Sequence, residues 1–167
     1  MMSHEERTYR SLIAHDRLES FRVVVKETDL LIKAQKNLVK ETQDLILKHR
    51  LPIERYAEDH PDFIHSLTPL VSDKFAPPIV QTMIQVGQQA GVGPMASVAG
   101  VLAEKVGIDL LEYSDEVIVE NGGDVFIRSD IPLNVAIFAG TSPLTNKIGV
   151  RIHTPDASMG VCTSSGT

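Results

Sequence analysis

The sequence predicts an α+β fold, and three observations carry this prediction. Short runs that read as strands stand at both ends of the chain, helical patterns occupy its middle, and glycine and proline separate the segments. At 167 residues the chain is long enough for one domain with a substantial core and short for two. We therefore expect a single domain over residues 1–167.

The first half of the chain predicts a small antiparallel sheet followed by helices. Phe21, Val23 and Val25 alternate with polar or exposed-type residues, which is the period of a half-buried strand. Apolar residues at helical spacing then predict a helix that Pro52 ends and a second helix that stops before Pro61. The expected elements are strands at 8–13, 21–26 and 30–32, helices at 36–50 and 53–59, and an irregular connection at 60–77.

The second half predicts two helices followed by strands. One helix is expected from Pro78 to Ala90 with Gly91 as its C-terminal stop, and another from Pro94 to Val106. The runs at 115–120 and 125–128 then read as a β-hairpin closed by Asn121 and Gly122. Three further strand-like runs are expected at 135–138, 148–152 and 159–162.

The amino-acid composition argues against one class of binding partner, nucleic acids. The formal net charge of −6 and an aromatic content of 5% argue against nucleic-acid binding, which relies on clustered cations and stacking rings. All eleven glycines lie from Gly87 onward. We therefore expect residues 1–75 to form a scaffold and residues 76–167 to form the half that is shaped around a small-molecule ligand.

The expected location is the cytoplasm. No segment is long and apolar enough to span a membrane, and the N-terminal residues contain no apolar run that could act as a secretion signal. The one cysteine, Cys162, rules out an internal disulfide and fits a reducing compartment. No membrane partner is expected.

The first candidate site segment is Gly91–Ser97, where Gly93 and Pro94 precede a helix. Amides in the first turn of a helix have no partner within the helix, so those of Met95, Ala96 and Ser97 form a candidate seat for an anion or a phosphate. The alternative is an ordinary helix start. The small residues Ala96, Ala99, Gly100 and Ala103 also form a stripe on this helix, which suits either close helix packing or a flat ligand.

The second candidate segment is the turn at 120–124. Gly122 and Gly123 permit close approach of a ligand to the backbone, and Asn121 and Asp124 place polar groups beside that approach. The alternative is a plain hairpin turn.

The third candidate segment is the C-terminal run at 162–167. Cys162 could act as a nucleophile if its pKa is lowered, with His153 as a candidate partner in space. The alternative is a buried cysteine that behaves as a small hydrophobic residue. The polar run Thr163, Ser164, Ser165 and Gly166 would follow it into the site. The histidines at 60 and 65 match no strong zinc spacing, so no metal site is predicted there.

Together, segments 91–100, 120–124 and 162–167 resemble an uncharacterised conserved family placed in the ApbE superfamily, and segments 28–32 and 60–63 fit the same family. The resemblance spans nearly the whole chain. It implies an α+β fold with mixed or antiparallel sheets and flanking helices, in which the three segments line one pocket. The better-known members of that superfamily are flavin transferases that bind FAD and use magnesium, so the resemblance implies FAD or FMN as a ligand and Mg²⁺ as a candidate cofactor.

The transferase residues themselves are not matched. Met95 and Ala96 stand where the transferases carry a lysine, and the positions that would supply their histidine and metal ligands have no counterpart here. Three functions therefore stay open. The first is a flavin- or nucleotide-phosphate-binding protein, with or without catalysis. The second is a sulfur-assimilation enzyme or carrier that uses Cys162. The third is a non-catalytic structural or regulatory protein, for which a homodimer is a candidate assembly.

Overall fold

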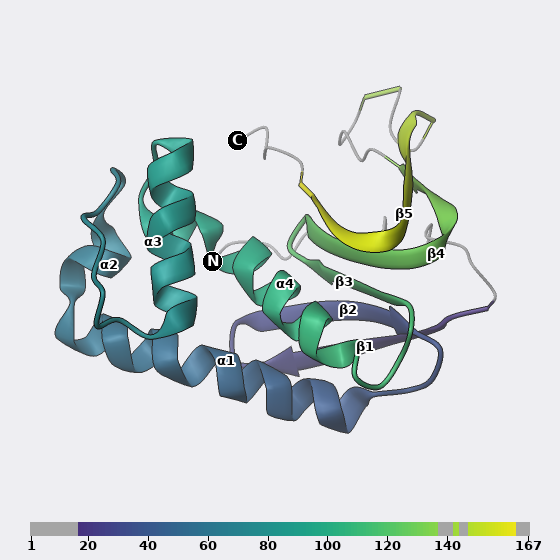
Figure 1. The fold of residues 1–167 in the computed structure, drawn as a ribbon, viewed down its shortest axis with the longest axis horizontal. Helices are drawn as coiled ribbons and strands as arrows, with labels where there is room; N and C mark the ends of the chain where they lie inside the picture. Colours follow the sequence, from purple (N-terminus) through teal and green to yellow (C-terminus); the bar gives the residue numbers. More distant parts are fainter. Residues whose placement is uncertain (1–16, 137–141, 144–146, 163–167) are drawn as a thin grey trace.

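Five antiparallel strands form the sheet of the computed structural model, in the order β1-β2-β3-β4-β5 (Figure 1). The structure describes residues 17–136, 142–143 and 147–162. The strands are β1 (Glu19–Val25), β2 (Thr28–Ala34), β3 (Val117–Asn121), β4 (Asp124–Ala136) and β5 (Gly149–Val161). The α+β class is confirmed, and every pair in the described sheet is antiparallel rather than mixed. The strand expected at 8–13 lies outside the described residues.

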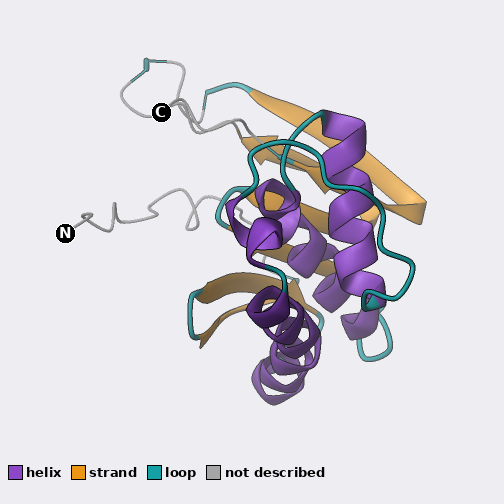
Figure 2. Cartoon of the chain, turned by 90° about the vertical axis from the view of Figure 1, so that its left-hand side faces the viewer, coloured by secondary structure: helices purple, strands orange, loops and turns teal. Residues whose placement is uncertain are grey.

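Every helix among the described residues lies in the chain between β2 and β3. They are α1 (Val39–Asp59), α2 (Pro61–His65), α3 (Pro78–Ala90), the 3₁₀ helix η2 (Pro94–Ser97) and α4 (Val98–Leu110). In two views α1 and α4 lie against the sheet, whereas α2 and α3 stand beside it (Figure 1, Figure 2). No helix among the described residues is long and apolar enough to cross a membrane.

Alternation in β1 and β2 determines which face of the sheet meets the helices. Phe21 pairs with Ile32, and Ile32 pairs in turn with Val119 of β3, so one face carries a continuous apolar row. Side chains of alternate strand residues point to the same face, and this row is buried beneath α1 and α4. The predicted strand at 21–26 is thereby confirmed, as is the one at 30–32.

The prediction that Pro52 ends a helix is wrong, because α1 continues through it from Val39 to Asp59. Proline has no backbone N–H, so a proline inside a helix cannot donate to the carbonyl four residues earlier, here that of Lys48. Burial of Ile46 on one side of Pro52 and Ile53 on the other stabilises the uninterrupted helix. The segment expected to be irregular also contains α2, which begins at Pro61 and buries Phe63.

The helix boundaries at Pro78, Ala90 and Gly91 are confirmed, with Gly91 in the left-handed conformation at φ 73°. The helix expected to begin at Pro94 is present in two parts, since the first four residues are 3₁₀ and α4 then runs to Leu110. This end lies beyond the Val106 of the prediction.

The β3–β4 hairpin is confirmed, but its two turn residues are Gly122 and Gly123, one position later than predicted. The strand expected at 125–128 extends to Ala136, so the run predicted at 135–138 begins inside β4 and then leaves the described residues. The runs at 148–152 and 159–162 were expected to be separate strands. They belong to the one long strand β5, whose pairing with β4 is irregular between Ile127 and Leu133.

Buried side chains form three clusters. The sheet cluster lies between the sheet, α1 and α4, the helical cluster lies among α1, α2, α3 and α4, and the third lies on the opposite face of the sheet. The largest fully buried members of the first two include Leu30, Ile46, Phe63 and Met83. Both α1 and α4 contribute to the sheet cluster and to the helical cluster, for example through Ile46 and Ile53 of α1.

A buried carboxylate fixes the start of the sheet. Glu116 accepts hydrogen bonds from both terminal nitrogens of Arg17, from the Ser129 hydroxyl at 2.7 Å and from the Asp130 amide at 3.1 Å. These donors, the Arg17 guanidinium first, lower the pKa of Glu116 to about 2 against the opposing effect of burial. The network joins the residues before β1 to β3 and β4.

Candidate functional site

The first two candidate segments meet where α4 begins and the β3–β4 hairpin turns, a place named here the α4 junction (residues 94–100 and 120–124). The Asn121 amide nitrogen donates to the Ala99 carbonyl at 3.0 Å. Asp124 lies opposite Gly100, because its Oδ1 is 3.2 Å from the position that a Cβ on residue 100 would take. The structure therefore brings together the two glycine-rich segments that the sequence singled out.

The third segment approaches the same place through the sheet. Val161, the last residue of β5, pairs with Val125 of β4, so the chain leaves β5 next to Asp124. Cys162 follows and is exposed. Thr163, Ser164, Ser165 and Gly166 lie outside the described residues, so their expected place in the site stays a prediction.

The first segment offers fewer unpaired amides than expected. The Gly93 amide donates to the Leu67 carbonyl at 3.0 Å, and the Ala96 amide donates to the Gly93 carbonyl at 3.2 Å. A Cβ on Gly93 would lie 1.8 Å from the Ser66 carbonyl oxygen, so close packing against the chain after α2 requires glycine there. These amides hold the 3₁₀ turn in place.

The side chains of this segment also have structural partners. The Ser97 hydroxyl donates to the Pro94 carbonyl at 2.8 Å, and Met95 packs against the helical cluster. Ala96 is exposed. The seat predicted from Met95, Ala96 and Ser97 is thus a 3₁₀ turn in which the Ala96 amide is already bonded.

The small-residue stripe of α4 serves close packing. Ala103 is buried in the sheet cluster, and a Cβ on Gly107, one turn further on, would lie 2.2 Å from a ring carbon of Phe126 in β4. The residues of this stripe let α4 approach β3 and β4 closely. The sequence left two interpretations of the stripe open, helix packing and a flat ligand. Packing accounts for its buried residue, Ala103.

The hairpin turn combines a backbone requirement with an unusual carboxylate. Gly122 and Gly123 have φ values of 63° and 107°, which suit a two-residue turn of the kind that favours glycine. The Gly123 amide donates to Glu120 Oε1 at 2.9 Å, and Glu120 itself is buried. The sequence placed Glu120 at the edge of the candidate turn without a role, and its burial is known only from the structure.

The electrostatics of the α4 junction are acidic. Burial raises the pKa of the half-buried Asp124 carboxyl above its ordinary value, and the negative charge of Glu120 raises it further. Two neighbouring carboxyl groups repel a bare phosphate and accept hydrogen bonds from hydroxyl or amine donors. The junction is therefore better suited to the sugar or ring edge of a ligand than to direct contact between Asp124 and a phosphate.

The environment of Cys162 differs from the prediction of a buried small hydrophobic residue, because its side chain is exposed at the end of β5. The candidate partner His153 stands nine positions earlier, on the same strand, which corresponds to roughly 30 Å of extended chain. His153 therefore does not pair with Cys162 as suggested.

A hollow of about 430 Å³ lies away from the α4 junction, along α1. The sequence did not predict this hollow, because a helix ending at Pro52 would not carry lining residues on both sides of the proline. His60, one of the two histidines considered for a metal site, borders the hollow. Its ring stacks on that of Tyr56, with centroids 3.9 Å apart, and its Nδ1 is hydrogen-bonded to the Tyr56 carbonyl. The residues that line the hollow are Lys48, Leu51, Pro52, Arg55, Tyr56, Asp59, His60 and Pro77.

Comparison with known proteins identifies relatives across most of the chain. The family model described as AbpE bacteria matches residues 10–167. A UPF0280 protein of Methanococcus aeolicus is 40% identical over 153 residues, covering 87% of this chain and 60% of its own length. UPF0280 proteins of Methanocaldococcus jannaschii and Methanococcoides burtonii are 40% identical over 149 residues and 36% identical over 145 residues, covering 87% and 86% of this chain and 60% and 61% of their own lengths.

These matches correct the family expected from the sequence. The matching model is that of AbpE bacteria and the relatives carry the UPF0280 name, so the assignment to the ApbE superfamily of flavin transferases is wrong. The chain spans about 60% of the length of the curated relatives it matches.

Proposed function

We propose, from the premise that this chain belongs to the AbpE bacteria family, that the α4 junction binds a nucleotide-type ligand such as a flavin or an adenine nucleotide. The observation that carries the proposal is the position of Asp124. Its half-buried carboxyl group faces Gly100 of α4, beside the exposed turn at Gly122 and at the end of β5. Three segments distant in sequence thus meet around one polar group.

Asp124 would bind the hydroxyl groups of the ligand's sugar. A carboxylate accepts two such hydrogen bonds, and an acidic side chain holds ribose hydroxyls in other nucleotide-binding folds, whereas Asp124 stands at the start of its strand. Burial and then the charge of Glu120 raise the pKa of the Asp124 carboxyl, and hydrogen bonds from hydroxyl donors would stabilise its ionised form.

The phosphate of the ligand would lie toward the start of α4, away from the two carboxyl groups. The Ala96 amide is already bonded, so the positive end of the dipole of η2 and α4, rather than unpaired amides, would attract the anion. The proposal concerns binding. Mg²⁺ enters it only as a cation bound to the nucleotide phosphate, which would reduce the repulsion between that phosphate and the carboxylates of Glu120 and Asp124.

Isothermal titration with FAD, FMN and ATP, each with and without Mg²⁺, tests the proposal. We expect binding of at least one of them, and we expect Asp124→Asn to weaken it at least about tenfold, because a neutral amide accepts hydroxyl bonds less well. The matched control is Asp115→Asn, an exposed acid at the other end of β3. The proposal fails if none of the three ligands binds, or if the two variants weaken binding equally.

The exposure of Cys162 favours a second function, a sulfur-handling enzyme or carrier. An exposed thiol at the end of a strand beside the α4 junction is accessible to a small sulfur-containing substrate. Alkylation of the native protein by iodoacetamide, followed by mass spectrometry, distinguishes the two functions. A Cys162 thiol that reacts no faster than a free cysteine at the same pH would remove this second candidate.

A further inference from the structure

The chain between α2 and α3 presents large apolar side chains to solvent although it is held firmly in place. Leu67 is 88% exposed, Val71 is 90% exposed and Phe75 is 98% exposed. These three residues are named here the apolar arm. Each of the three leaves apolar area in contact with water, so covering it with a partner would be favourable.

Hydrogen bonds from neighbouring helices fix the backbone that carries the apolar arm. The Gln88 side chain of α3 donates to the Leu70 carbonyl at 2.6 Å, and Gln81 donates to the Ala76 carbonyl at 2.7 Å. The Tyr56 hydroxyl of α1 donates to Asp73 at 3.0 Å, and Asp73 in turn accepts the Phe75 amide at 2.8 Å. A segment ordered in this way loses little further entropy when a partner covers it.

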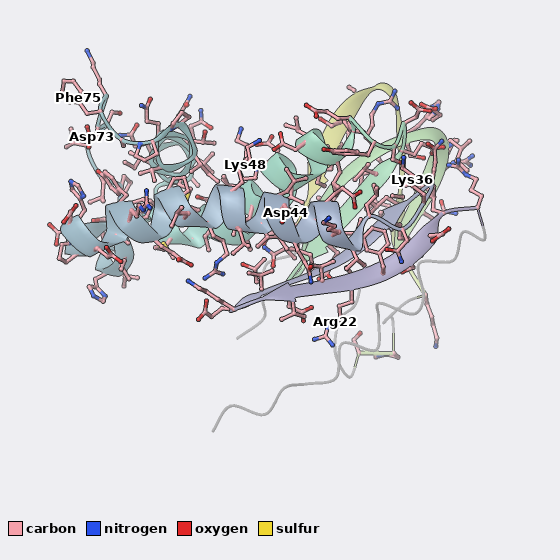
Figure 3. All side chains as sticks on the ribbon, turned by 90° about the horizontal axis from the view of Figure 1, so that it is seen from below. Arg22, Lys36, Asp44, Lys48, Asp73 and Phe75 are labelled. Carbon is pink, nitrogen blue, oxygen red and sulfur yellow. The ribbon has the colours of Figure 1, made fainter. Side chains whose placement is uncertain are left out.

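An apolar hollow lies next to the apolar arm. The 430 Å³ hollow along α1 is bordered by Leu51, Pro52, the ring of Tyr56 and Pro77. Pro77 follows Phe75 by two residues, yet Phe75 projects into solvent and leaves the hollow unfilled by its own side chain. In Figure 3, Phe75, Asp73 and Lys48 lie on the same side of α1, opposite Arg22.

A projecting ring and an adjacent hollow on one surface are the two halves of a self-complementary contact. In a two-fold symmetric dimer the same patch serves both copies, so Phe75 of each copy can enter the hollow of the other. The hollow is large enough for a phenyl ring, and Arg55 at its border would lie near the ring face in a favourable cation–π position.

The charges beside the ring and the hollow are also complementary. Lys74 precedes Phe75, and Asp59 borders the hollow. Within the part of the chain that the structure describes, neither of these two side chains has an ion-pair partner. Insertion of Phe75 into the partner copy would bring each Lys74 toward the partner's Asp59. We propose that the apolar arm and the α1 hollow form the interface of a symmetric dimer between two copies of this chain.

Sedimentation velocity over a range of protein concentrations tests this dimer. We expect a reversible monomer–dimer equilibrium, and we expect Phe75→Ser to weaken it at least about a hundredfold because the buried ring is lost twice. Phe75 makes no buried contact in the single chain, so the variant should fold normally and keep its melting temperature. The matched control is Val24→Ser, which removes a 50% exposed apolar side chain from β1 and should leave the equilibrium unchanged.

A charge exchange tests the register of the interface. Lys74→Glu and Asp59→Lys should each weaken association about tenfold, because each places like charges together, and the double variant should return to within about threefold of the unmodified chain. A chain that stays monomeric throughout, a dimer indifferent to Phe75→Ser, or a double variant that is weaker than either single variant would overturn the proposal.

Discussion

A ring of Phe126 in β4 fills the space that a side chain on Gly107 of α4 would need, with Cδ1 2.2 Å from the position of such a Cβ. This contact determines how closely α4 lies on the sheet, and it does so at the far end of the helix from the α4 junction. Both residues are buried, and Phe126 belongs to the sheet cluster.

Gly107→Ala should therefore destabilise the fold. The added methyl group must displace the Phe126 ring or lift α4, which typically costs about 1–3 kcal/mol and outweighs the gain of up to about 1 kcal/mol in helix propensity. Urea unfolding followed by circular dichroism measures the difference. The control is Glu104→Ala on the exposed side of α4, which should change stability by less than about 0.5 kcal/mol. A Gly107→Ala variant more stable than the parent would contradict the contact.

Glu116 should make the stability of the chain fall at acidic pH. Its folded-state pKa of about 2 lies below its ordinary value of 4.5, so the ionised carboxylate stabilises the fold above pH 4.5 and that contribution is lost as the pH falls toward 2. The shift corresponds to about 2–3 kcal/mol, allowing for the partial exposure of Arg17.

Unfolding by urea at pH 7, 5, 4 and 3 measures this contribution. The stability difference between the parent chain and Glu116→Gln should be largest at pH 7 and should shrink steadily below pH 4.5. The exposed Glu112→Gln serves as control and should follow the parent at every pH. A difference that does not vary with pH would show that the Arg17–Glu116 pair does not control acid stability.

Pro52→Ala should stabilise α1. Alanine restores the amide that Pro52 lacks, and a proline inside a helix costs about 3 kcal/mol relative to alanine. This gain is offset in part, by about 1 kcal/mol or less, because proline also restricts the unfolded chain, so we expect a net gain of about 2 kcal/mol in thermal or urea unfolding. Pro61→Ala, at the first position of α2, should show no such gain. A loss of stability in Pro52→Ala would mean that packing around the hollow depends on the proline.

Asp124→Asn should stabilise the unliganded chain at neutral pH. The folded state raises the pKa of Asp124, through burial first and Glu120 second, so ionisation of this group opposes folding as the pH rises. The gain should be less than about 1 kcal/mol at pH 7 and should vanish at a pH where Asp124 is protonated. Equal stability of the two chains at pH 7 would contradict a raised pKa of Asp124, whether from burial or from the charge of Glu120.

Much of the fold could be predicted because local patterns and tertiary packing agree. The alternation at Phe21, Val23 and Val25 and the helix boundaries at Pro78 and Gly91 each reflect one dominant local preference, and the structure confirms them. Pro52 is the reverse case. Local preference would end the helix there, and burial of Ile46 and Ile53 on either side outweighs it.

The sequence anticipated that two of the candidate segments lie together, but it did not show what holds them there. The sequence brought Gly100 and Asp124 into one predicted pocket, and the structure places them in contact. It could not reveal that the Gly93 amide is bonded to the Leu67 carbonyl, because that contact joins segments separated by an irregular connection. The burial of Glu120 was likewise invisible, since a glutamate in a hairpin turn is ordinarily solvated.

Helices α1 and α4 each belong to two buried clusters at once. α1 carries Ile46 into the sheet cluster and Ile53 into the helical cluster, and α4 joins the same pair through Val106 and Leu102. Neither cluster can unfold without displacing a shared helix from the other. Heat or denaturant should consequently unfold the strands and the helices in one cooperative step. A destabilising substitution in either cluster should lower the stability of the whole molecule.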